Sequence, residues 1–185
     1  MTPPLTYATC LHMQGRQRFL LWAPGGEPKP DHFVTWPGEP RLLVADSLSA
    51  LQTLATRCGH VLADDVPSRI DFDAMLRALA GLRDDQAPST STATHLLDGW
   101  NTLEDLARSL GVPVEPDNDE EAAILEKAYR KVFHGSNLPS LTPQDCSYHP
   151  LFNAGERRLL RRHLRGLWAD ILRRAGETGA PLASV

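Results

Sequence analysis

The fold of this chain is decided by one stretch of its sequence, Arg41-Leu42-Leu43-Val44-Ala45-Asp46-Ser47-Leu48-Ser49-Ala50-Leu51. Its first five residues are nearly all apolar, so we expect residues 41–45 to form the central strand of a sheet. From Ser47 onward the apolar residues recur with the 3.6-residue period of a helix, and Ser47 is a suitable N-cap. The stretch therefore separates a strand-rich N-terminal part from a helix-rich remainder.

The sequence before this stretch predicts short strands. Residues 5–13 and 16–23 flank Gln14-Gly15, which indicates a hairpin turn. Residues 24–31 are rich in Pro and Gly and predict a loop, because proline cannot donate to a strand ladder. A further short strand is expected at residues 32–36.

The sequence after this stretch predicts about five helices. The first runs from Ser47 to a stop at Gly59, and the second begins at Asp71. After a polar loop at residues 83–94, the third runs from about residue 93 to 110, and the fourth follows residues 114–118. The fifth has Asn153 as its cap and Glu156 three residues later, which is a capping box. Strands followed by helices predict an α+β fold: an N-terminal antiparallel sheet of short strands with about five helices packed on it.

Length and composition are those of an ordinary globular protein. The chain has 185 residues, of which 42% are hydrophobic and 23% are charged. We expect one domain over residues 1–175 and a disordered tail at 176–185. The first residues lack the features of a signal peptide, and no segment has the length and hydropathy of a membrane-spanning helix. The three cysteines, Cys10, Cys58 and Cys146, are an odd number without regular spacing, which, with no export signal, favours free thiols in a reducing compartment. We therefore expect a cytoplasmic protein, and, in the absence of a membrane-spanning segment, no membrane association.

Charge is distributed unevenly along the chain, which has a net charge of −4. Residues 157–185 carry +5, from seven arginines against Asp170 and Glu177, and residues 1–156 carry −9. The densest acidic run lies between residues 115 and 121, with five carboxylates in seven positions, more than helix capping requires. We expect these residues, with two from the polar loop, to form a surface that binds a basic protein. They are Glu115, Asp117, Asp119, Glu120, Glu121, Asp84 and Asp85.

Two interpretations of the arginine-rich last helix stay open at the level of the sequence. Its guanidinium groups could lie along the phosphates of a nucleic acid, in a small binding or regulatory module. Alternatively, the arginines flank an apolar stripe and pair with the acidic body of the protein. The net negative charge of the chain favours the second interpretation.

Few residues suggest chemistry. The sequence contains no Gly-x-x-x-x-Gly-Lys phosphate loop and no Gly-x-Ser-x-Gly elbow. Cys146 and His149 have the spacing of half a zinc site or of a nucleophile pair, but no second Cys or His pair accompanies them, which favours incidental loop residues. Asp71 and Asp73 are explained by a helix start. We therefore expect no enzymatic activity, no cofactor and no metal.

An ordered set of motifs resembles the immunity proteins of bacterial contact-dependent growth inhibition and related polymorphic toxin systems. The motifs are Ile70-Asp71-Phe72-Asp73, the run from Leu96-Leu97-Asp98-Gly99-Trp100-Asn101 to Asp105-Leu106-Ala107, Tyr129-Arg130-Lys131-Val132-Phe133 with Gly135-Ser136-Asn137-Leu138-Pro139, Thr142-Pro143 and Tyr148-His149-Pro150. Their order, over about residues 32–170, carries the resemblance. Ser136 stands where the family pattern has Asn, and residues 24–31 have no counterpart.

The resemblance implies a cytoplasmic protein that binds a cognate toxin domain, often a nuclease, one-to-one and blocks its active site. It implies no direct contact with nucleic acid. The motif residues are then scaffold rather than contact residues: Asp71, Phe72, Trp100, Asn101, Asp105, Phe133, Asn137 and Pro139. We expect Trp100 to be buried and Asn101 to be a buried residue whose side chain links the third helix to a loop, with a surface contact as the alternative for Asn101.

Overall fold

The computed structural model describes residues 5–26, 28–64, 66–116, 118–143, 146–179 and 182. The chain packs as two compact units. The first, here called the sheet unit, comprises Met1–Asp71, Thr102–Val114 and Leu167–Val185. The second, the helical unit, comprises Phe72–Asn101 and Glu115–Gly166. Two helices, α3 (Thr90–Leu110) and α5 (Ala154–Glu177), contribute one part to each unit.

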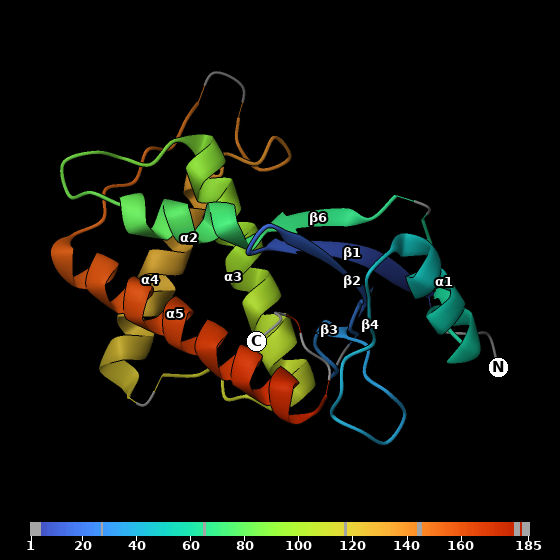
Figure 1. The fold of residues 1–185 in the computed structure, drawn as a ribbon. Coiled ribbons are helices and arrows are strands. Elements are labelled where there is room, and N and C mark those ends of the chain that lie inside the picture. The colour runs from blue at the N-terminus through green and yellow to red at the C-terminus, as the bar shows by residue number, and fades with distance from the viewer. Residues whose placement is uncertain are drawn as a thin grey trace. The chain divides into compact units, whose positions relative to one another are not determined.

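The described residues form six strands and five helices, which confirms the α+β class. The sheet is centred on the hairpin of β1 (Leu5–Met13) and β2 (Arg16–Ala23), drawn in blue in Figure 1. Gln14 and Gly15 have φ values of 50° and 70°, the left-handed conformation that a two-residue hairpin turn requires. The hairpin expected from the sequence is therefore confirmed.

The other four strands are shorter and flank this hairpin. Strands β3 (His32–Phe33) and β4 (Val44–Ala45) pair antiparallel with β2. Strands β5 (Val61–Leu62) and β6 (Ser68–Asp71) pair parallel with β1. The sheet is thus mixed, and the expectation of a purely antiparallel sheet was wrong because these two parallel strands were not foreseen.

The two central strands are β1 and β2, so the assignment of residues 41–45 to the central strand was wrong. Only Val44 and Ala45 of that stretch form a strand, and they pair with β2 alone. Leu42 and Leu43 are nevertheless buried, with 1% and 0% of their surface exposed. The apolar run reflects side-chain burial in the core, and burial does not require a central place in the hydrogen-bonded ladder.

Helix α1 (Leu48–Arg57) supplies the core on one face of the sheet. Ser47 caps the helix as expected, since its Oγ accepts a hydrogen bond from Ala50 N at 3.2 Å, and Gly59 ends it with φ +78°. Leu51 and Ala55 are its buried residues. They belong to one core cluster with residues from the sheet and the segments beside it: Ala8, Leu21, Ala23, Val34, Leu43 and Ala45.

The second part of α3 is joined to the sheet by polar contacts within the sheet unit. Trp22 Nε1 donates to Asp105 Oδ2 at 3.0 Å, and the backbone N–H of Phe33 donates to Ser109 Oγ at 2.8 Å. Asp105, only 9% exposed, also accepts from Arg108 at 2.5 Å, so its buried charge is both paired and hydrogen-bonded.

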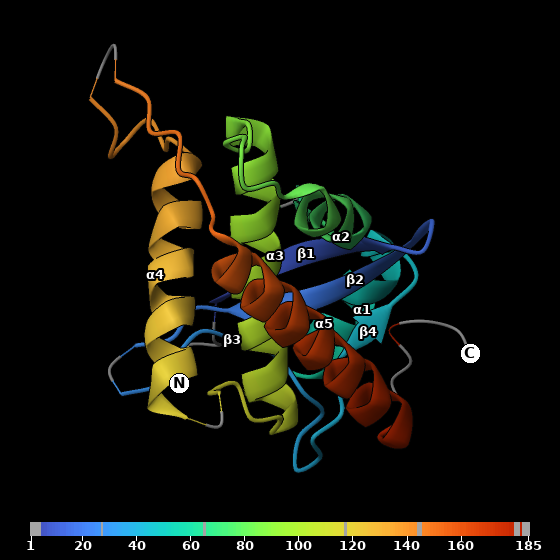
Figure 2. The same ribbon diagram turned by 90° about the vertical axis from the view of Figure 1, so that its left-hand side faces the viewer.

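The helical unit consists of α2 (Phe72–Gly81), α4 (Asp119–Gly135), and the first parts of α3 and α5. Figure 2 shows α4 running beside α3, where Trp100 and Tyr129 make an edge-on ring contact at 5.2 Å. Helix α3 begins at Thr90, three residues before the expected start, because Ser89 Oγ accepts from Thr92 N at 3.1 Å and caps it.

Helices α2 and α3 approach each other closely at Gly99. A Cβ atom at this position would lie 2.6 Å from Cγ of Met75, whose side chain is fully buried. Only glycine allows the two helices this spacing. Among the described residues, no helix combines the length and the hydropathy needed to cross a membrane.

Candidate functional site

The first turn of α4 carries the densest part of the acidic run. Asn118 is the N-cap, and its Oδ1 accepts a hydrogen bond from Glu121 N at 2.9 Å. Asp119, Glu120 and Glu121 follow, at the end of the helix where the dipole is positive. Because Asn118 performs the capping, the carboxylates of this turn are available for other contacts.

One of these carboxylates is paired within the protein. Glu121 forms an ion pair with Arg162 of α5 at 2.5 Å, and the hydrogen bond from Arg162 lowers the pKa of Glu121. By contrast, Glu115, Asp119 and Glu120 are exposed and have no cationic partner in the described part of the chain. These three residues are called the acidic tip below. Asp117 lies outside the described residues.

A groove borders the acidic tip between the first turns of α4 and α5. Its volume is about 460 Å³, and Ile124 and Leu159 contribute its apolar surface. Charged side chains of both signs surround this surface: Glu120, Glu121, Arg158 and Arg162. An apolar patch within a charged rim is the usual composition of a protein-binding surface.

The two acidic residues of the polar loop do not join this surface. Asp84 forms an ion pair with Arg157 at 3.3 Å, and hydrogen bonds from its own backbone N–H and from Arg157 lower its pKa. Asp85 is exposed and lacks a partner among the described residues. Figures 1 and 2 agree that this loop and the start of α4 lie at opposite ends of the helical unit. The six expected contact residues that the structure describes therefore do not form one continuous patch.

Most arginines of α5 bind groups within their own unit. Arg161 donates to the backbone carbonyls of Leu79, Ala80 and Leu82 at 2.8–3.0 Å, and so satisfies the C-terminal end of α2. Arg174 donates to Leu110 O at 3.4 Å in the same way at the end of α3. Three others form ion pairs: Arg157 with Asp84, Arg162 with Glu121, and Arg173 with Asp170 and Glu177.

Arg158 and Arg165 are the exceptions. Both are exposed and have no hydrogen-bond or ion-pair partner in the part of the chain that the structure describes. This distribution supports the interpretation that the arginines pair with the body of the protein.

Trp100 and Asn101 differ in burial. Trp100 is 3% exposed, which confirms the expectation for this side chain. Asn101 is exposed, and its Oδ1 accepts a hydrogen bond from Tyr129 Oη of α4 at 2.9 Å. The expectation that Asn101 is a buried link to a loop was therefore wrong, because its side chain projects from the outer side of α3 toward another helix.

Asn137 makes the link between helix and loop that was expected of Asn101. It has φ +46°, and its Nδ2 donates to the carbonyls of Gly135 and Tyr148 at 3.0 and 3.1 Å and to Thr90 Oγ1 at 3.2 Å. Its Oδ1 accepts from Tyr148 N at 2.7 Å. One amide thus joins the end of α4, the start of α3 and the loop before α5.

The remaining motif residues have varied positions. Phe72 is fully buried at the start of α2, and Asp71, the last residue of β6, lies with Oδ1 3.5 Å from His12 Nδ1. Phe133 is half-buried and stacks on Tyr129, with ring centroids 6.4 Å apart. Pro139 is exposed.

The cysteines are free. Cys146 and His149 are both exposed in the loop before α5. Cys10 is buried in β1, where burial raises the pKa of its thiol. A raised pKa leaves this thiol less nucleophilic at neutral pH.

A buried ion pair was not foreseen from the sequence. Glu156 is 2% exposed and accepts from Lys131 Nζ at 2.6 and 2.8 Å, as well as from Asn153 N at 2.9 Å in the expected capping box. Burial raises the pKa of Glu156, but the hydrogen bonds from Lys131 and Asn153 lower it by more, so the net shift is downward. The two charges are 25 residues apart, and no local spacing connects them.

Comparisons with protein-family models, with curated proteins and with solved structures gave no match to this chain.

Proposed function

We propose that this chain is an immunity protein that binds and neutralises a cognate toxin domain of a contact-dependent growth inhibition system. The proposed toxin is a nuclease, the complex is one-to-one, and the proposed location is the cytoplasm. The immunity protein blocks the toxin and performs no reaction itself.

The observation that carries the proposal is the acidic tip. Glu115, Asp119 and Glu120 are exposed and, in the described part of the chain, have no cationic partner. Close carboxylates repel one another, and a cationic partner relieves that repulsion. A nuclease has a cationic groove for phosphates, so an acidic inhibitor gains fast, electrostatically steered association with it.

The placement of the motif residues supports the same proposal. Trp100 and Asp105 are buried, and Asn137 hydrogen-bonds three segments of the helical unit. In a family of inhibitors, such residues maintain the fold while the surface changes with each partner. The resemblance to immunity proteins, which also supports the proposal, concerns these scaffold positions.

The arginine pattern weighs against the alternative of a nucleic-acid-binding module. Phosphate contacts need guanidinium groups available along one face. On α5, five of the seven arginines already bind carbonyls or carboxylates within their own units. Duplex DNA binding that falls in an Arg158→Gln/Arg165→Gln variant would favour the alternative.

The test uses the toxin domain encoded next to this chain. Co-purification with the toxin and protection of growth on co-expression are expected for the wild type. The variant Glu115→Lys/Asp119→Lys/Glu120→Lys should associate roughly tenfold more slowly in stopped flow, with a weaker dependence on salt. Its dissociation rate should change less, because rim charges act mainly on association.

Asp85→Lys is the matched control, since Asp85 is an exposed acidic residue at the other end of the helical unit. The association rate of Asp85→Lys with the toxin should be close to that of the wild type. Failure of the wild type both to co-purify and to protect growth would show that the proposed function is wrong. A wild-type complex whose rate is insensitive to the triple substitution would instead show that the toxin binds elsewhere.

A further inference from the structure

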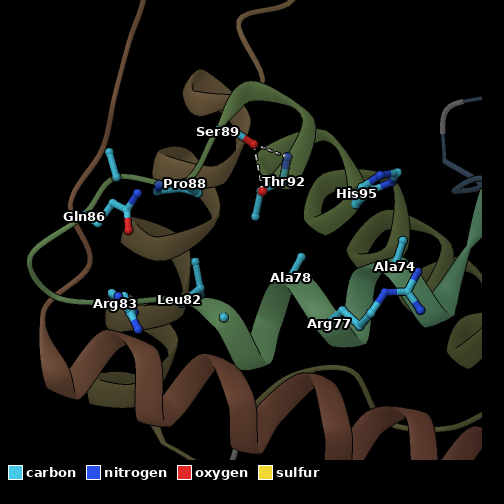
Figure 3. Close-up of a pocket in the computed structure, with 12 residues that line it drawn as sticks. Ala74, Arg77, Ala78, Leu82, Arg83, Gln86, Pro88, Ser89, Thr92 and His95 are labelled. Atoms are coloured by element: carbon cyan, nitrogen blue, oxygen red, sulfur yellow. Dashed lines mark hydrogen bonds between the residues drawn. The ribbon is translucent and has the colours of Figure 1, made fainter.

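A second groove lies in the helical unit, between α2 and the first turns of α3. The loop at residues 82–89 closes one end of it (Figure 3). Its volume of about 520 Å³ is within the range of clefts that bind ligands. Neither the acidic tip nor the residues that line the groove beside it belong to this second groove.

Each end of the groove carries a cationic side chain. Arg77 and His95 lie toward one end, and Arg83 and Gln86 lie toward the other (Figure 3). Arg77 and Arg83 are exposed, and neither has an ion pair or a hydrogen bond within the described ranges. The nearest carboxylate in sequence to Arg83, that of Asp84, pairs with Arg157 instead.

The middle of the groove is uncharged. Ala78, Leu82 and Pro88 contribute apolar surface there, and Leu82 is 5% exposed. The hydroxyls of Ser89 and Thr92 lie 2.9 Å apart and are hydrogen-bonded to each other (Figure 3). A ligand that fits these walls has a neutral, largely apolar centre and an anionic group toward each end.

We propose that this groove binds an acidic peptide segment with two carboxylates three residues apart. Arg77 is four residues before Gly81, the last residue of α2, which corresponds to about 6 Å along the helix, and Arg83 follows two residues later, adding at most about 7 Å. The Cα atoms of the two arginines are therefore no more than about 13 Å apart, and their long, flexible side chains can reach carboxylates that are about 9 Å apart. A peptide in the polyproline II conformation rises about 3.1 Å per residue with three residues per turn, so side chains at i and i+3 lie on one side about 9 Å apart. Each carboxylate can then receive both N–H groups of one guanidinium fork.

The experiment measures fluorescence anisotropy of a labelled peptide with a Glu-Pro-Pro-Glu core, whose prolines favour this conformation. Binding to the wild-type chain is expected at low salt and should weaken as salt is added. Arg77→Gln and Arg83→Gln should each weaken it roughly two- to fivefold, as for exposed charge pairs, and the double variant by about the product. Arg165→Gln is the matched control, because Arg165 is equally exposed and without a partner in the described chain but does not line the groove.

Two further ligands test the spacing and the ligand class. A Glu-Glu-Pro-Pro peptide has the same charge with adjacent carboxylates and should bind more weakly than Glu-Pro-Pro-Glu. Inorganic phosphate should compete only weakly, because a single anion cannot contact both arginines. Equal binding of the two peptides, or phosphate as effective as the peptide, would overturn the two-ended site in favour of a simple anion site.

The proposal is also overturned if Glu-Pro-Pro-Glu shows no binding up to about 1 mM. The same holds if Arg165→Gln weakens binding as much as the groove variants do, since binding would then follow overall charge. Arg77 and Arg83 are surface residues, so their substitution leaves the fold intact, and unchanged thermal unfolding of each variant verifies this.

Discussion

Removal of Lys131 should leave a buried carboxylate without its main cation. Lys131→Met keeps the length of the side chain and abolishes two hydrogen bonds to Glu156 and one to Leu151 O at 2.8 Å. Loss of one partner of a buried ion pair costs about 3–5 kcal/mol, because the remaining charge stays desolvated. For a chain of this length the melting temperature should fall by about 6–20 °C.

The matched control is Lys127→Met. Lys127 Nζ lies 3.8 Å from the same carboxylate, but its side chain is 67% exposed, against 18% for Lys131. An exposed pair contributes at most about 1 kcal/mol, so this variant should unfold at nearly the wild-type urea concentration. Equal, small losses in the free energy of unfolding of the two variants at pH 7 would refute the reasoning that Lys131 stabilises the buried charge of Glu156.

The effect of pH gives a second measurement. The folded-state pKa of Glu156 is lowered, so its ionised form stabilises the wild type above the unfolded-state pKa of about 4.3. That contribution is lost as pH falls through the folded-state pKa. The difference in unfolding free energy between wild type and Lys131→Met should therefore narrow below about pH 4, where the variant's carboxyl group is protonated and uncharged.

Three other substitutions test the scaffold. Gly99→Ala should cost about 1–3 kcal/mol in urea unfolding, because the new Cβ would meet Met75; a neutral effect would mean that the two helices separate easily. Trp100→Ala should cost about 3–5 kcal/mol by thermal or urea unfolding, and an unchanged melt would contradict its burial. Asn137→Ala should be more destabilising than Asn137→Gly, because both variants lose the side-chain amide but only alanine is strained at φ +46°. Both variants should also speed hydrogen exchange at Tyr148 N, which loses its acceptor. Equal stability of the two variants and unchanged exchange would argue against this role for the amide.

Local signals predicted much of the fold. The Gln14-Gly15 turn, the Ser47 cap and the Asn153–Glu156 capping box each depend on residues within a few positions of one another, and each has the expected geometry. Such interactions are encoded by spacing alone.

Long-range pairing was not predictable in the same way. Strand β6 joins the sheet through partners such as Thr9 and Ser68, and β5 contributes only two residues. Short parallel strands show little alternation of apolar and polar residues, and their pairing depends on contacts between residues that are far apart in the sequence. For the same reason the sequence misplaced the central strand.

The candidate site was predicted only in part. The sequence placed the acidic run at the start of a helix, but the partners of its carboxylates depend on packing. Glu121 and Asp84 are paired by arginines of α5, whereas Asp119 and Glu120 have no cation in the described structure. The role of an asparagine could not be predicted from the sequence, because it depends on which groups surround the side chain. Asn101 accepts a hydrogen bond from one hydroxyl on the surface, whereas Asn137 forms hydrogen bonds to three segments.

The hydrogen bonds of Asn137 to Tyr148 make the intervening segment a replaceable part of the molecule. Because both of its ends are held by one side chain, residues 138–147 can change in length with a modest entropic cost, about 0.6 kcal/mol for each doubling. Natural variants can therefore acquire insertions here without remodelling the helices on either side. The same position suits the grafting of an epitope or a reporter peptide, which would leave the acidic tip, at the other end of α4, undisturbed.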